Sequence, residues 1–188
     1  MNLSSNKRIA VLATVIFALD QLSKLGIIKY FGFGEEKVLL DGFFKLVYWL
    51  NTGAAWSMFR DNNQMLAIVD LLALLILFLV RHRFETHTTL GWVSLGLLFG
   101  GITGNLLDRL LPARQAVIDF IYFYIRRSGG REIGFPAFNV ADSAICIGVA
   151  LLFFLSLQKE KASAAQARAG AGNSTADRES PIADEAAQ

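Results

Sequence analysis

The sequence predicts an all-α integral membrane protein with four transmembrane helices, a small extracytoplasmic β-rich cradle and an interfacial helix or strand. The 188 residues are 54% hydrophobic and have a mean hydropathy of +0.44, which is more apolar than ordinary soluble domains. Four apolar runs have about the 20-residue length that crosses a bilayer. The stretches that precede the second and fourth runs are aromatic and glycine-containing instead.

We expect the four spans at residues 9–28, 64–80, 88–107 and 140–157. The first run is longer than the apolar core of a secretion signal, and no clear small-residue cleavage site follows it, so we expect it to be retained. Five glycines in the third run permit close helix packing in lipid. The membrane domain would then comprise residues 1–158. The alanine-rich, polar residues 159–188 predict a disordered cytoplasmic tail.

Two stretches outside the spans favour structure at one membrane face. Residues 30–60 contain the β-favouring run KLVYWL after a turn signal at Asp41-Gly42. Residues 108–134 contain VIDFIYFYI, whose aromatic residues suit a strand or a helix at the membrane boundary. Four spans place both termini on one side. The lysines and arginines are nearly balanced between the two sides, although the RHR link at 81–83 favours cytoplasmic termini.

Composition excludes several kinds of site. The net charge is +2 and the basic residues are scattered, which argues against nucleic acid as a partner. The single Cys146 excludes an internal disulfide and a CxxC site. His82 and His87 lack the HExxH spacing of zinc hydrolases, so we interpret them as solvated loop residues. We therefore predict neither a metal nor a cofactor.

Ionisable groups inside the spans need a partner or a purpose, since each costs about 2.5–3.5 kcal/mol at the centre of the bilayer. Asp20 and Lys24 are four residues apart on one helix face, which predicts an ion pair. Asn105 and Arg109 are also four residues apart. A hydrogen bond between helices explains Asn105 as well as a role in a site would, and an arginine that reaches to the lipid headgroups explains Arg109 equally well. Asp70 has no partner at helical spacing.

The polar residues nevertheless gather on one side of the predicted topology, which favours a site there. Those that map to this side are Asp20, Lys24, Asn51, Asn105, Arg109, Asp119, Asn139 and Asp142.

Two carboxylates are the best candidates for chemistry at this site, because the side holds neither a histidine nor a cysteine paired with a base. Asn139 is a good helix N-cap, and Asp142 three residues later suits the positive end of that helix for purely structural reasons. If the chain folds back so that Asp119 meets Asp142, the pair would share one proton, with one carboxylate as base and the other as acid. That is the chemistry of aspartic proteases, although the spacing alone does not require it.

Five motifs carry a resemblance to a known family. In chain order they are DQLSK at 20–24, NTGAAWS at 51–57, GGITGNLLDR at 100–109, VIDFI at 117–121 and FPAFNVADSAI at 135–145. In this combination the sequence resembles the lipoprotein signal peptidases, the type II signal peptidases of bacterial inner membranes.

The resemblance implies a membrane aspartyl endopeptidase with cytoplasmic termini and a site near the outer leaflet. Its substrates would be diacylglyceryl-modified prolipoproteins, cleaved just before the lipidated cysteine, and globomycin-type inhibitors would occupy the site. The catalytic dyad would be Asp119 and Asp142. The supporting residues would be Asp20, Lys24, Asn51, Gly53, Asn105, Arg109, Asn139 and Ala141. We expect a monomer in contact with membrane lipid.

Two other functions fit the residues less well. In a small ion- or proton-coupled transporter, Asp20, Lys24, Asp70 and Asp142 would form a path, but such a path should place ionisable groups through the whole membrane depth. A non-catalytic membrane scaffold is the third hypothesis.

Overall fold

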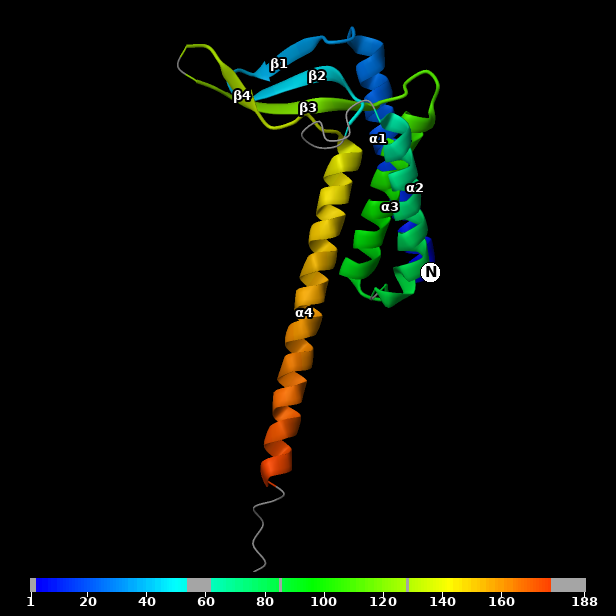
Figure 1. Cartoon of the computed structure of the whole chain (residues 1–188), viewed down its shortest axis with the longest axis vertical. Coiled ribbons are helices and arrows are strands. Elements are labelled where there is room, and N and C mark those ends of the chain that lie inside the picture. The colour runs from blue at the N-terminus through cyan, green and yellow to red at the C-terminus, as the bar shows by residue number, and fades with distance from the viewer. Residues whose placement is uncertain (1–2, 54–61, 85, 128, 177–188) are drawn as a thin grey trace, which may run out of the picture.

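Four long helices form the body of the protein (Figure 1). The computed structural model describes residues 3–53, 62–84, 86–127 and 129–176. The helices are α1 (Ser5–Tyr30), α2 (Asn63–Val80), α3 (Thr89–Leu110) and α4 (Val140–Ala176), and a short 3-10 helix, η2 (Arg81–Arg83), follows α2. Each long helix contains a segment long and apolar enough to cross a membrane.

Helix α3 is the centre of the bundle. Its apolar window is 56% buried, against 17% for each of the other three helices, so α1, α2 and α4 present most of their surface to lipid. Glycines let the neighbours approach closely: a Cβ at Gly100 would lie 2.6 Å from the Ala13 carbonyl of α1, and one at Gly101 would lie 2.6 Å from the Ala141 carbonyl of α4. The glycine-rich span thus packs as its composition predicts.

A four-stranded antiparallel sheet lies across one end of the bundle (Figure 1). Its strands, in sheet order, are β1 (Glu36–Leu40), β2 (Phe44–Asn51), β3 (Val117–Arg126) and β4 (Glu132–Gly134). The predicted turn joins β1 to β2, and Gly42 there has a φ of 75°, a conformation that favours glycine. The predicted fold class is confirmed. Of the two alternatives for the run VIDFIYFYI, the strand is confirmed, because the run lies within β3.

The sheet is fastened to the helices by an apolar cluster. Ile118 and Phe120 of β3 pack with Ile27 near the end of α1, and Val140 at the start of α4 covers the same cluster. Residues 117–120 are all buried, so both faces of β3 are covered here. Asp119, in this part of β3, therefore lies where the sheet meets the ends of the helices.

Helix α4 continues to Ala176 and extends beyond the other helices (Figure 1). This differs from the expectation of disorder from residue 159, because stretch 159–176 is helical. Its alanines explain the difference, since alanine has the highest intrinsic helix propensity and needs no apolar core to be helical. Residues 177–188 lie outside the described residues.

Candidate active site

The beginning of α4 carries Asp142 in a reciprocal capping arrangement. The Asp142 backbone N–H donates to Asn139 Oδ1 over 2.9 Å, and the Asn139 backbone N–H donates to Asp142 Oδ2 over 3.2 Å. This is a capping box with aspartate in the position of the usual glutamate. The predicted N-cap is confirmed, and it leaves Asp142 Oδ1 available to other donors.

Asn139 also binds the second carboxylate. Its Nδ2 donates to Asp119 Oδ1 over 2.9 Å, while Asn51 Nδ2 donates to Asp119 Oδ2 over 3.0 Å. Both predicted carboxylates therefore accept hydrogen bonds from one asparagine. Gly53 in turn orients Asn51, because its backbone N–H donates to Asn51 Oδ1 over 2.9 Å. The rest of the NTGAAWS motif, residues 54–57, lies outside the described residues.

Burial makes the carboxyl of Asp119 a weaker acid than an ordinary aspartate. Asp119 is only 3% exposed. This burial, together with a smaller effect of the nearby charge of Asp142, raises the pKa of the Asp119 carboxyl to about 8. The hydrogen bonds from Asn51 and Asn139 oppose this increase without cancelling it. The pKa of Asp119 therefore lies well above that of an ordinary carboxyl, which favours its protonated form.

Beneath the carboxylates lies a buried ion cluster centred on Lys24. Its Nζ lies 2.8 Å from Asp20 Oδ2, 2.6 Å from Asp108 Oδ2 and 3.1 Å from Asn105 Oδ1. The lysine and both aspartate side chains are 0% exposed. The predicted Asp20–Lys24 ion pair is confirmed, and Asp108 is a third member that was not predicted from the sequence.

Residues of the ion cluster bond to the first turn of α4, which carries Asp142. Asn105, which accepts from Lys24, donates through Nδ2 to Asp142 Oδ1 over 2.7 Å. Asp20 Oδ1 accepts from the Ala141 backbone N–H over 3.0 Å. Gly104 leaves the room for this contact, because a Cβ there would lie 2.5 Å from Asp20 Oδ2. The first turn of α4 is thus bonded to α1 and α3 at the same depth.

Asp108 connects the ion cluster to the loop that leads into the sheet. Arg114 forms an ion pair with Asp108, and Arg114 Nη1 also donates to Gln21 Oε1 over 2.8 Å. Two carboxylates, Asp20 and Asp108, are thereby balanced by Lys24 and Arg114. One signal could have found Asp108: it follows Asn105 by three residues, which places both on one helix face.

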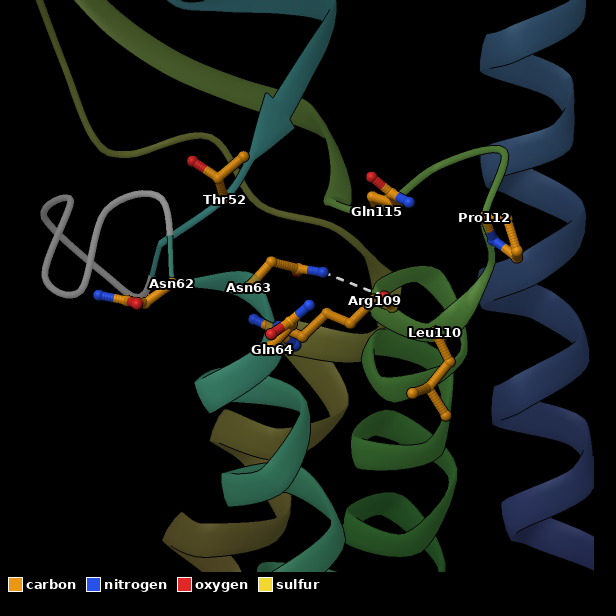
Figure 2. A pocket seen from close by; sticks show the side chains of 8 residues that line it. All are labelled: Thr52, Asn62, Asn63, Gln64, Arg109, Leu110, Pro112 and Gln115. Carbon is orange, nitrogen blue, oxygen red and sulfur yellow. Dashed lines mark hydrogen bonds between the residues drawn. The ribbon is translucent and has the colours of Figure 1, made fainter.

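Arg109, by contrast, points toward α2. Its Nη1 lies 2.7 Å from Asp70 Oδ2, which supplies the partner that Asp70 lacks at helical spacing. Arg109 also lines a pocket of about 670 Å³ between the beginning of α2 and the end of α3 (Figure 2). The other described residues that line it are Thr52, Asn62, Asn63, Gln64, Leu110, Pro112 and Gln115.

The structure thus brings together the eight residues that the sequence places on one side, although Arg109 joins the neighbouring pocket rather than the carboxylates. A helical membrane bundle that holds a buried and a half-buried aspartate at one end, both bonded to one asparagine, has the site of a class of protein: the membrane aspartyl proteases.

Comparisons with known proteins identify the family. The sequence model described as "Signal peptidase (SPase) II" matches residues 12–158. A relative named "Lipoprotein signal peptidase", from Geobacillus thermodenitrificans (strain NG80-2), is 34% identical over 143 residues, which cover 76% of this chain and 85% of the relative.

Two solved structures share the fold. Both are described as a "Bacterial membrane enzyme structure by the in meso method", at 2.3 and 1.9 Å resolution, and both are 28% identical to this chain. The first has a TM-score of 0.69, and the match covers 82% of this chain and 90% of that structure. The second has a TM-score of 0.66, and the match covers 79% of this chain and 92% of that structure.

The chain belongs to the signal peptidase II family. It is therefore a multi-pass membrane aspartyl protease that processes prolipoproteins. This replaces the transporter and scaffold alternatives that the residues alone left open.

Proposed function

We propose that Asp119 and Asp142 are the catalytic dyad of this protease. The observation that carries the proposal is that Asn139 donates hydrogen bonds to both carboxylates in a mostly buried site, where the sheet meets the end of the bundle. Two close carboxylates in such a site share a proton, and peptide hydrolysis by an aspartyl protease needs one neutral and one charged member.

The surroundings favour a division of labour between the two. Asp142 lies at the positive end of α4, and its donor Asn105 is polarised by the ammonium of Lys24. These contacts stabilise a negative charge on Asp142, which we assign as the base that activates water. Asp119, protonated at neutral pH, donates to the carbonyl oxygen of the scissile peptide bond.

The other predicted residues then have three roles. Asp20, Lys24 and Asn105, together with the Ala141 backbone N–H, hold Asp142 in place. Asn51 and Asn139 hold Asp119, and Gly53 orients Asn51. Arg109 is assigned to substrate binding, because it lines the adjacent pocket.

We further propose that the termini are cytoplasmic and that the sheet end of the bundle faces outward in a bacterial inner membrane. A diacylglyceryl group keeps the scissile bond near the membrane surface, and both carboxylates lie at the end of the bundle that would meet that surface. The enzyme would work as a monomer without a cofactor and would cleave just before the lipidated cysteine. Globomycin-type inhibitors would occupy the site.

The direct test is cleavage of a defined substrate. We expect the purified protein to cleave a diacylglyceryl-modified lipobox peptide just before the lipidated cysteine, and globomycin to block the cleavage. Mass spectrometry of the products locates the cleaved bond. The same peptide without the diacylglyceryl group is the control, and cleavage at another bond would contradict the proposed specificity.

The raised pKa of Asp119 predicts a pH dependence. Because the acid form of Asp119 is the working form, we expect kcat/KM to fall about tenfold per pH unit above about pH 8, as the carboxyl loses its proton. Initial rates between roughly pH 6 and pH 10 check this, with thermal unfolding followed at each pH to separate inactivation from unfolding. A profile that stays flat to the upper limit, in folded protein, would contradict the assignment of Asp119 as acid.

A further inference from the structure

The pocket between α2 and α3 is lined by residues that are close in sequence to the donors of both carboxylates. Thr52 in its wall directly follows Asn51, the donor to Asp119, and Arg109 lies one helical turn beyond Asn105, the donor to Asp142. An extended peptide advances about 3.3 Å per residue, so a substrate bound at the dyad has residues to place in a neighbouring pocket of about 670 Å³.

Two buried side-chain atoms of residues that line this pocket have no hydrogen-bond partner among the described residues. One is the N–H donor Arg109 Nε, on a side chain that is only 9% exposed, and the other is the acceptor Asn63 Oδ1. Figure 2 shows the Asn63 side chain directed at Arg109, whose carbonyl oxygen accepts from Asn63 Nδ2 over 3.0 Å. An unpaired donor and an unpaired acceptor therefore belong to two residues that are joined by this hydrogen bond and line one pocket, and such groups are costly to bury without a partner.

Asp70 determines what kind of ligand these atoms can take. It is seven residues after Asn63 on α2, so both face Arg109, and its Oδ2 lies 2.7 Å from Arg109 Nη1. The ion pair fixes the guanidinium and neutralises its charge. A phosphate would meet the carboxylate of Asp70, and both phosphate and the esters of a diacylglyceryl group offer only acceptors, which leaves Asn63 Oδ1 unpaired.

We infer that Asn63 is a further substrate-binding residue, whose Oδ1 accepts from a main-chain N–H of the bound peptide while Arg109 Nε donates to a main-chain carbonyl. A peptide backbone supplies this pair of groups, one acceptor and one donor, whatever the side chains are. The inference rests on the proposed function, because it takes the peptide cleaved at the dyad as the ligand. It adds a residue outside the five family motifs and states which chemical group that residue recognises.

N-methylation of the substrate tests this contact without altering the enzyme. A set of lipidated lipobox peptides, each methylated at one backbone nitrogen, is cleaved by the wild-type protein. We expect one position at which the methyl group raises KM about tenfold with little change in kcat, the effect of losing one hydrogen bond that is not made at the reacting atoms. Cleavage of the unmethylated peptide tests the proposed function separately, so the two can fail independently.

Variants of Asn63 then assign the contact. In Asn63→Ala, KM for the unmethylated peptide should rise by a similar factor, and methylation at the sensitive position should change KM less than about twofold. Asn63→Asp keeps an acceptor oxygen and should keep the sensitivity. Asn6→Ala is the matched control, because Asn6 is an exposed asparagine in the first turn of α1 and does not line this pocket.

Loss of the Asn63 Nδ2 bond to Arg109 can also lower stability, so thermal unfolding is measured for each variant. The inference is overturned if no position shows the KM effect in wild-type protein. It is equally overturned if a sensitive position keeps its full sensitivity in folded Asn63→Ala.

Discussion

Replacing either aspartate of the proposed dyad by asparagine should reduce kcat by at least about 10³-fold, since each variant removes a group that takes up or donates a proton in the reaction. A neutral amide in place of Asp142 could not act as base, and one in place of Asp119 could not donate an acidic proton. Both substitutions preserve shape: Asp142→Asn retains one oxygen for the Asn139 backbone N–H that caps α4. Single-turnover cleavage of a lipidated lipobox peptide measures the effect.

The control for these variants is Asp41→Asn. Asp41 forms an ion pair with Arg126 on the sheet, but its side chain is 71% exposed, so the same chemical change there should leave kcat within about twofold. Thermal unfolding in detergent shows whether each variant is folded. Activity within tenfold of wild type in folded Asp119→Asn or Asp142→Asn would exclude that residue from the dyad.

The largest expected effect on stability comes from Lys24→Met. This change removes the cation from a cluster in which Asp20 and Asp108 are both 0% exposed, and an unpaired buried carboxylate is destabilising by about 3–5 kcal/mol. For a protein of this size the midpoint of thermal unfolding should fall by at least about 6 °C. Activity should be lost as well, because Asn105 would lose the charge that polarises it.

Lys45→Met is the matched comparison. Lys45 bonds to two carboxylates, from Glu36 and Glu132, at 2.8 and 2.6 Å, but these partners are 38% and 30% exposed. Water can solvate them when the lysine is gone, so the cost should be about 1 kcal/mol or less. Equal shifts for Lys24→Met and Lys45→Met would contradict the argument that burial of the partners determines the cost.

The parts of the structure that sequence could predict depend on local patterns. Hydropathy indicated four apolar runs because each is a continuous stretch. The Asp20–Lys24 pair and the cap of α4 by Asn139 followed from spacings of three or four residues. The sheet was predicted only as β-rich stretches, because antiparallel pairing of β2 with β3 joins residues more than sixty positions apart.

The sequence could not predict which charged and polar side chains tertiary packing brings into contact. Asp70 had no visible partner because Arg109 lies on another helix, and Asp108 was missed because its cations, Lys24 and Arg114, come from two other parts of the chain. Nor does the spacing of Asp119 and Asp142 reveal that Asn139 contacts both. A hydropathy profile treats each charge by itself, whereas the free energy of a buried charge depends on its neighbours.

The double use of Asn139, as helix cap and as donor to both carboxylates, has a consequence for resistance to the globomycin-type inhibitors that we propose would occupy the site. A substitution there that weakened an inhibitor would also remove the hydrogen bonds that begin α4 and hold Asp119. Such a substitution would therefore inactivate the protease as well as weaken the inhibitor. We therefore expect resistant variants to arise at the rim of the neighbouring pocket, where the exposed Asn62 and Gln64 can change at little cost to the fold.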